Sequence, residues 1–416
     1  MSSDPAPSPA LARRDVLRLG AGAAAGLVAA RSFGAAPASA TPAVPPAPPS
    51  LAPTGPILKP LPPEWFVTYG TNAEMRWDSV DPRRYLTPAE RLFVRNHTST
   101  PTIDPATYAL RIFGDGLADA RTPERAHVLS YRDLVRLPSR TVTSLLECTG
   151  NARSYFASQQ GTPASGTAWQ LGAVGTVRWT GVPLALVLRS LGLRSDAVDV
   201  QATGLDPSFV SGGVDYGRVR RPFPVAKALD DALLVYAMNG RALPPDHGFP
   251  VRLLLPGWVG IANIKWVGEL EVSRSPLTSP WNTKWYRMTG GDYPADAPPL
   301  TVLPVKSAFE LARDAVLPAR RRTVLTGRAW SGAAPVTRVE VSTDGGASWE
   351  RARITRHGRG GGWAQWAYPW RPRTSGPQVL LSRATDRAGR TQPATVPYND
   401  NGYLFSAVVR HPVVIA

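Results

Sequence analysis

The chain has 416 residues, with 47 lysines and arginines against 31 acids and a formal net charge of +16. The basic residues are scattered and form no helical stripe with interleaved aromatic side chains, which excludes nucleic acid as the expected partner and favours a surface or cleft suited to small anions. A single cysteine, Cys148, excludes an intramolecular disulfide and a metal site built from several thiolates.

The first forty residues have the pattern of a twin-arginine export signal. Arg13 and Arg14 precede an apolar stretch rich in Ala and Gly, and Ala38-Ser39-Ala40 forms a small-residue cleavage site. A membrane anchor is the alternative, but the apolar part is short and Gly-rich for a span of about 20 residues. We therefore expect a signal peptide over residues 1–40, the twin-arginine export machinery as a partner, and an exported (periplasmic or extracytoplasmic) protein. Because this route carries folded proteins, the signal also hints at a cofactor.

Pro and Ala dominate the residues that follow. Such a composition cannot bury a core and is typical of an extended linker. We expect this linker over residues 41–64 and folded structure from about Trp65. About 350 residues then remain, which is enough for two domains with their own cores.

Residues 65–295 alternate between helical and strand-like patterns. The patterns predict strands at 108–113, 142–146, 198–203, 233–238, 251–255 and 264–272, and helices at 130–137 and 182–191. Ser130 is a typical helix cap, Pro183 fits a first helical turn, and Asn239-Gly240 is a hairpin turn signal. This part of the chain is therefore predicted to be an α+β domain.

From residue 296 the pattern becomes all-β. Strands are predicted at 324–330, 336–342 and 379–384, and Asp344-Gly345-Gly346 and Asp386-Arg387-Ala388-Gly389 supply turns. Short strands at this spacing predict an immunoglobulin-like sandwich over residues 296–416.

Cys148 follows the predicted strand at 142–146 and opens a small, polar, Gly-containing turn. A lone cysteine that has a function acts either as a nucleophile or as one thiolate ligand. The alternative is a buried inert thiol, because free Cys packs as a small hydrophobic residue.

The residues around Cys148 resemble a known family. Cys148-Thr149-Gly150-Asn151-Ala152-Arg153 is similar to the Cys-Ala-Gly-Asn-Arg-Arg element whose thiolate binds molybdenum in the sulfite oxidase family. Five further elements follow the family's order: Phe93 to His97, Gly175 to Leu184, Asn239-Gly240 with Leu243 to Arg252, Pro256-Gly257-Trp258, and Ile264-Lys265-Trp266. The resemblance covers about residues 65 to 416. It implies a sulfite-oxidase-type molybdopterin domain over residues 65–295, followed by the immunoglobulin-like domain over 296–416 as a dimerisation domain, and so points to a homodimer.

The resemblance also implies a molybdenum–molybdopterin cofactor with Cys148 as its protein ligand, since one thiolate completes a soft-ligand set. The implied contacts to the pterin and its phosphate are His97, Asp206, His247, Arg252 and Lys265. Taken singly, these residues could also be surface charges, a turn cap or a loop acid. Arg95 and Arg153 are implied to hold a small oxyanion through their guanidinium forks. Tyr286 matches an active-site tyrosine, and its alternative is a core aromatic residue.

The implied reaction is oxygen-atom transfer to sulfite, which gives sulfate and passes electrons to an external acceptor such as a cytochrome c. With one cysteine there is no Cys-x-x-Cys-His haem motif, and no cytochrome domain fits before Trp65, so we expect no haem.

Two positions depart from the family. Ala152 replaces the first of the two consecutive arginines, and Asn401 stands where vertebrate sulfite oxidases carry an arginine. A pocket that has lost a fixed positive charge binds a dianion less tightly. Two alternatives therefore stay open: a reductase of nitrate or a sulfoxide on the same molybdenum centre, and a non-catalytic relative.

Overall fold

The computed structural model describes residues 56–416. The expected signal peptide and most of the expected linker lie outside the described residues. Within the described part, contacts begin before Trp65, where we expected folded structure to start. The backbone amides of Leu58 and Lys59 donate to the Asp246 carboxylate at 3.0 and 2.7 Å. No helix among residues 56–416 is long and apolar enough to cross a membrane.

Between residues 56 and 280, the strands form three larger sheets and a small hairpin. The first sheet has the order β1 (Phe66–Tyr69), β2 (Asn72–Met75), β3 (Val94–Arg95). The second has the order β11 (Arg220–Pro224), β8 (Asp199–Gly204), β15 (Val267–Ser273), β4 (Ala109–Phe113), β5 (His127–Ser130). The third has the order β13 (Arg241–Ala242), β12 (Leu233–Met238), β7 (Val174–Pro183), β6 (Arg140–Glu147), with β14 (Arg252–Leu254) also paired to β12. The hairpin joins β9 (Val210–Ser211) to β10 (Val214–Asp215).

Within residues 56–416, five short α-helices and four 3-10 turns accompany these sheets. They are α1 (Tyr131–Arg136), α2 (Ser154–Gln160), α3 (Leu184–Ser190), α4 (Val225–Asp230), α5 (Pro280–Thr283), η1 (Trp77–Ser79), η2 (Pro123–Arg125), η3 (Pro245–His247) and η4 (Gly260–Ala262). As predicted, Ser130 caps α1, and with Asp133 it forms a reciprocal capping box. The second predicted helix begins later than expected, at Leu184, because Val182 and Pro183 still pair with β12 as the end of β7.

The C-terminal part is built of strands in two sheets. One has the order β16 (Lys306–Phe309), β18 (Thr323–Trp330), β22 (Ala364–Trp370), β21 (Arg353–Arg356). The other has the order β17 (Ala315–Leu317), β24 (His411–Ile415), β23 (Gly376–Asp386), β19 (Val336–Ser342), β20 (Glu350–Arg351). One cluster of buried hydrophobic side chains comes entirely from residues 305–415. An α+β part followed by a mostly-sheet part is therefore confirmed, while the immunoglobulin-like description stays a prediction.

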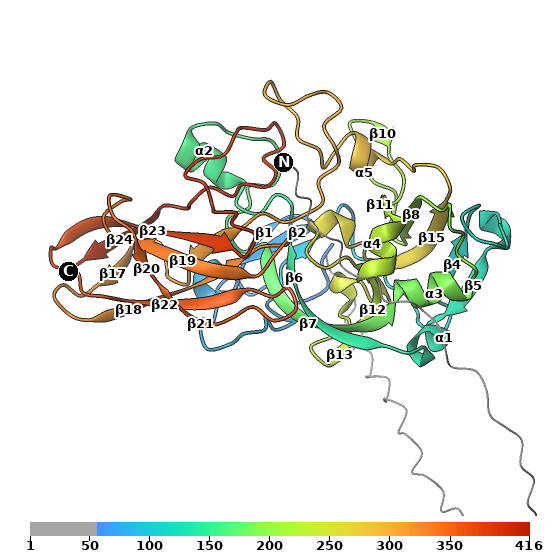
Figure 1. The fold of residues 1–416 in the computed structure, drawn as a ribbon, viewed down its shortest axis with the longest axis horizontal. Helices are drawn as coiled ribbons and strands as arrows, with labels where there is room; N and C mark the ends of the chain where they lie inside the picture. Colours follow the sequence, from blue (N-terminus) through green and yellow to red (C-terminus); the bar gives the residue numbers. More distant parts are fainter. Residues whose placement is uncertain (1–55) are drawn as a thin grey trace, which may run out of the picture. The chain divides into compact units, whose positions relative to one another are not determined.

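Strand β6 leads directly to Cys148. It pairs with β7 along its whole length, and its last four residues are buried. Its free edge meets the C-terminal part, where the Leu145 amide donates to the Gly361 carbonyl at 3.1 Å. Figure 1 shows the orange and red strands of the C-terminal part grouped beside β6 and β7. The turn that carries Cys148 is therefore supported from both parts of the chain.

Candidate active site

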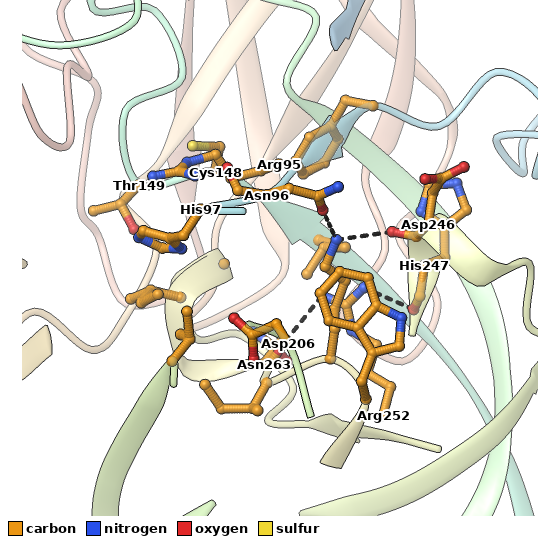
Figure 2. A pocket seen from close by; sticks show the side chains of 18 of the residues that line it. Arg95, Asn96, His97, Cys148, Thr149, Asp206, Asp246, His247, Arg252 and Asn263 are labelled. Carbon is orange, nitrogen blue, oxygen red and sulfur yellow. Dashed lines mark hydrogen bonds between the residues drawn. The ribbon is translucent and has the colours of Figure 1, made fainter. Parts of the chain in front are cut away.

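The Cys148 turn forms one end of a pocket. The Cys148 amide donates to the Ala173 carbonyl at 2.9 Å, and the residue is only 8% exposed. Figure 2 shows Cys148 with Arg95 and His97 at one end and Asp246 with His247 at the other. Predicted residues in the lining are Arg95, His97, Cys148, Asp206, His247, Arg252, Lys265 and Tyr286. Among the described residues, no three His, Cys, Asp or Glu side chains are grouped to hold a metal ion.

Cationic side chains gather at the end of this pocket away from Cys148. The Lys265 ammonium donates to the Asp246 carbonyl at 2.8 Å and also to the Asn96 side chain. The Arg252 guanidinium donates to the carbonyls of His247 and Asn263 at 3.3 and 3.1 Å. Backbone carbonyls thus fix the direction of both side chains, and two basic groups at one end of the pocket suit an anionic ligand.

Burial changes the protonation of these groups. It lowers the pKa of Arg252 to about 9. Burial and the positive charge of Arg252 lower the pKa of Lys265 well below its usual range. Burial and the charges of Lys59 and Lys265 lower the pKa of His247 well below its usual range. The imidazole of His247 is therefore neutral at pH 7. An anion bound here would favour the charged form of each cation.

Three buried polar atoms beside this pocket have no hydrogen-bond partner within the described residues. They are His247 Nε2, Arg252 Nε and Thr149 Oγ1. A buried polar atom left without a partner costs about 1–3 kcal/mol, and such atoms are rare in folded proteins. Because all three residues line one pocket, the pocket is built for a ligand rich in hydrogen-bonding groups.

A second hollow of about 220 Å³ adjoins the first on the other side of Cys148. Arg95, His97, Cys148 and Tyr286 line both. Arg153, at the start of α2, lines only the second, so the nine predicted site residues lie around two adjoining cavities. Their roles remain predictions.

The Arg153 guanidinium is fixed in a narrow slot. Its Nε donates to the Asn401 carbonyl and its Nη1 to the Thr167 carbonyl, each at 2.7 Å. Glycines form the walls: a Cβ added at Gly150 would lie 2.5 Å from Arg153 Nη2, and one at Gly402 would lie 2.6 Å from Arg153 Cγ. The remaining N–H groups of the guanidinium are left for an anion.

Tyr286 and His97 are joined at the boundary of the two cavities. The Tyr286 hydroxyl lies 3.4 Å from His97 Nε2, and the Trp281 indole donates to the same nitrogen at 3.1 Å. Because an indole N–H can only donate, His97 Nε2 is an acceptor and the ring proton lies on Nδ1. Burial, with Arg95 and Lys265 nearby, lowers the pKa of His97. Burial raises the pKa of Tyr286, so its hydroxyl keeps its proton at neutral pH.

Ala152 and Asn401, the two positions that differ from the family, are both fixed by their surroundings. Ala152 is 1% exposed and has a positive φ of 75° within the Cys148 turn. The Asn401 side chain donates to Thr289 Oγ1 at 3.1 Å, and only its backbone carbonyl reaches Arg153. Neither position supplies a positive charge to the second hollow.

Several site residues were not predicted. Thr149, Asp246 and Asn263 line the first pocket, and Trp285 and Tyr403 line the second. Thr149 and Asp246 lie inside quoted motifs, next to Cys148 and His247, and that adjacency could have identified them. Asn263 and Tyr403 carry no comparable sequence signal.

Comparisons with known proteins match both parts of the chain. Residues 97–281 match the oxidoreductase molybdopterin binding domain, and residues 299–414 match the Mo-co oxidoreductase dimerisation domain. Sulfite oxidase of Gallus gallus is 36% identical over 78% of this chain and 72% of its own length. The NADH nitrate reductase of Ulva prolifera is 29% identical over 79% of this chain and 40% of its own length. This chain spans only 60% of the length of some vertebrate sulfite oxidases that it matches.

A solved structure matches most of the chain. It is the sulfane dehydrogenase SoxCD from Paracoccus pantotrophus, with a TM-score of 0.68 and 26% identity over 81% of this chain and 82% of that chain.

Proposed function

Because the chain belongs to the sulfite oxidase family of molybdopterin-binding oxidoreductases, we propose that it oxidises sulfite to sulfate and passes the two electrons to an external acceptor. One observation carries this proposal. Cys148 lies between a pocket with unpartnered buried polar atoms and a hollow with two guanidinium groups. The first suits a large anionic cofactor and the second a small oxyanion.

The residues of the first pocket fit a molybdenum–molybdopterin cofactor. Cys148 would supply the protein thiolate, and Arg252, Lys265 and His247 would contact the phosphate and pterin. When bound, the molybdenum centre supplies two-electron oxygen-atom transfer. Burial raises the pKa of the Cys148 thiol, while the Arg95 and Arg153 charges oppose this shift and favour the thiolate.

The second hollow would hold the substrate. Arg95 and Arg153 would bind the sulfite oxygens, and Tyr286 would donate its hydroxyl proton to one of them in place of His97 Nε2, which lies 3.4 Å away in this structure. Overall, sulfite and one water give sulfate, two protons and two electrons.

The proposal extends to partners and location. The dimerisation-domain match supports a homodimer. A cytochrome c is the expected electron acceptor, and we propose no haem in this chain. We also propose export after cleavage of the twin-arginine signal.

The test is an assay of purified enzyme loaded with cofactor, using sulfite and a dye acceptor, beside nitrate and a sulfoxide with a reduced dye. We expect about one molybdenum per chain and sulfite-dependent dye reduction. Cys148→Ser should abolish turnover. Full sulfite oxidation by Cys148→Ser, or reduction of nitrate without sulfite oxidation, would contradict the proposal.

A further inference from the structure

The substrate hollow is more aromatic than a small oxyanion requires. Six rings line it, from His97, Trp169, Phe209, Trp285, Tyr286 and Tyr403. The lining includes two guanidinium groups and no carboxylate. A hollow of about 220 Å³ with this lining has room for an apolar group beside an anion.

The aromatic side chains at the outer rim form a connected cluster. The Phe209 and Trp285 ring centroids are 5.7 Å apart, and Tyr216 lies 4.7 Å from Trp285. Phe209 also lies 5.3 Å from His97, which links the rim to the inner site. Phe209 and Trp285 are only half-buried, so their faces can still be covered by a ligand.

The rim comes from two segments that are distant in the sequence. Phe209 immediately precedes the β9–β10 hairpin, and Trp285 follows α5. An apolar substituent that extends from the anion past the inner site would meet Phe209 and Trp285, which both line the hollow.

Both guanidinium groups of the hollow keep N–H groups for an anion. Arg153 donates two of its N–H groups to backbone carbonyls, and the Asn401 amide is bound to Thr289. Arg95 donates to the Asn96 carbonyl and the Asn72 side chain. The N–H groups that remain on Arg95 and Arg153 can bind the oxygens of an oxyanion head.

We infer that this site oxidises organosulfinates, R–SO₂⁻, to sulfonates, with the apolar R group against Phe209 and Trp285. The inference rests on the proposed oxygen-atom transfer. A new S–O bond forms at the sulfur lone pair, and the oxygen comes from water. The sulfur loses two electrons, which reduce two molecules of a one-electron acceptor such as ferricyanide, and two protons pass to solvent. A sulfinate thus needs no bond broken at sulfur and no reactant beyond those of sulfite oxidation.

The experiment compares sulfite, methanesulfinate and benzenesulfinate on the molybdenum-loaded enzyme, with ferricyanide as acceptor. We expect benzenesulfinate to be oxidised with a KM at least tenfold below that of methanesulfinate. Mass spectrometry should find benzenesulfonate with one oxygen from labelled water. A second measurement does not depend on turnover. Titrating the enzyme with benzenesulfinate, without oxygen or acceptor, should quench its tryptophan fluorescence, because Trp169 and Trp285 line the hollow.

Variants of the rim residues test whether the rim determines the preference for sulfinates. Phe209→Ala and Trp285→Ala should each lower the ratio of kcat/KM for benzenesulfinate to that for sulfite by at least tenfold. Trp349→Ala, in the C-terminal part and outside the hollow, is the control and should leave the ratio unchanged.

The outcomes distinguish the two hypotheses. Oxidation of sulfite but of neither sulfinate overturns the inference and leaves the proposed function intact. Oxidation of sulfinates but not of sulfite supports the inference and overturns sulfite as the substrate. No turnover with any of the three, at full molybdenum content, overturns both.

Discussion

The Lys306 ammonium lies 2.8 Å from the Glu147 carboxylate, and both side chains are almost fully buried. Glu147 also accepts hydrogen bonds from the Trp330 indole and the Asn151 amide, each at 2.9 Å. Lys306 belongs to β16 and Trp330 to β18, whereas Glu147 is the last residue of β6. Two strands of the C-terminal part therefore fix the residue that precedes Cys148.

Lys306→Met should destabilise the protein and reduce its molybdenum content. Removing one partner of a buried ion pair leaves an uncompensated charge, which costs about 3–5 kcal/mol. Denaturant unfolding and metal analysis measure the two effects. The double variant Lys306→Met with Glu147→Gln should lose less stability than the sum of the single variants.

Arg328→Met is a matched control for this prediction. Arg328 and Glu310 form another buried ion pair, in the C-terminal part and without contact to the Cys148 turn. Its loss should lower stability similarly while molybdenum content stays near the wild-type value. If Arg328→Met and Lys306→Met lost metal equally, the effect would be general unfolding.

The local parts of the fold could be predicted from the sequence. Strands β12 and β19 have the predicted bounds, and α1 begins directly after its predicted cap at Ser130. These elements depend on residue patterns within a few positions. The start of α3 was wrong by two residues, because pairing with β12 extends β7 through Pro183 despite a helix-like pattern.

The candidate site was less predictable where its contacts are distant in sequence. Leu58 and Asp246 are 188 residues apart, and Arg153 and Asn401 are 248 apart. No periodicity or spacing encodes such contacts, and only the resemblance to a family brought the site residues together. Tyr403, stacked on Tyr286 at 5.0 Å, had no sequence signal.

Asp246→Ala should make the enzyme release its cofactor faster. The Asp246 carboxylate accepts the amides of Leu58 and Lys59 and, at 2.5 Å, the Thr100 hydroxyl. It thereby holds the N-terminal segment against the turn that carries His247. Each donor left without a partner costs about 1–3 kcal/mol. Molybdenum and pterin retained after timed gel filtration, with hydrogen exchange at residues 57–59, measure the change.

Asp344→Ala is the control for Asp246→Ala. Its carboxylate likewise accepts hydrogen bonds from a turn, from Ser342 and Ser348, but in the C-terminal part. This variant should release cofactor at the wild-type rate. An Asp246→Ala enzyme with wild-type retention would refute the role given to the N-terminal segment.

We expect the free energy of unfolding of the cofactor-free protein to fall as the pH rises from about 4 to 6, because of the buried Asp206 carboxyl group. Burial raises its pKa from 3.8 to about 6, so in this range the folded state keeps a proton that the unfolded state has lost. Stability falls with pH wherever the folded state binds more protons, here by about 3 kcal/mol in total. Asp206→Asn should remove this fall, and urea unfolding of both proteins at pH 4 and pH 7 measures it. An equal stability difference between the two proteins at both pH values would contradict the prediction.

Gly402→Ala should raise the KM for sulfite by tenfold or more without loss of molybdenum. The added Cβ would lie 2.6 Å from Arg153 Cγ and 2.8 Å from Ala164 Cβ, so the guanidinium must leave its slot. Gly402 also has a φ of +55°, where alanine is strained by about 1 kcal/mol. Gly70→Ala separates the two effects, because Gly70 has a similar φ of +64° and no atom within 4 Å of the added Cβ. Both variants should lose similar stability from backbone strain, but only Gly402→Ala should lose sulfite affinity. An unchanged KM in Gly402→Ala would mean that the slot does not position Arg153 for the anion.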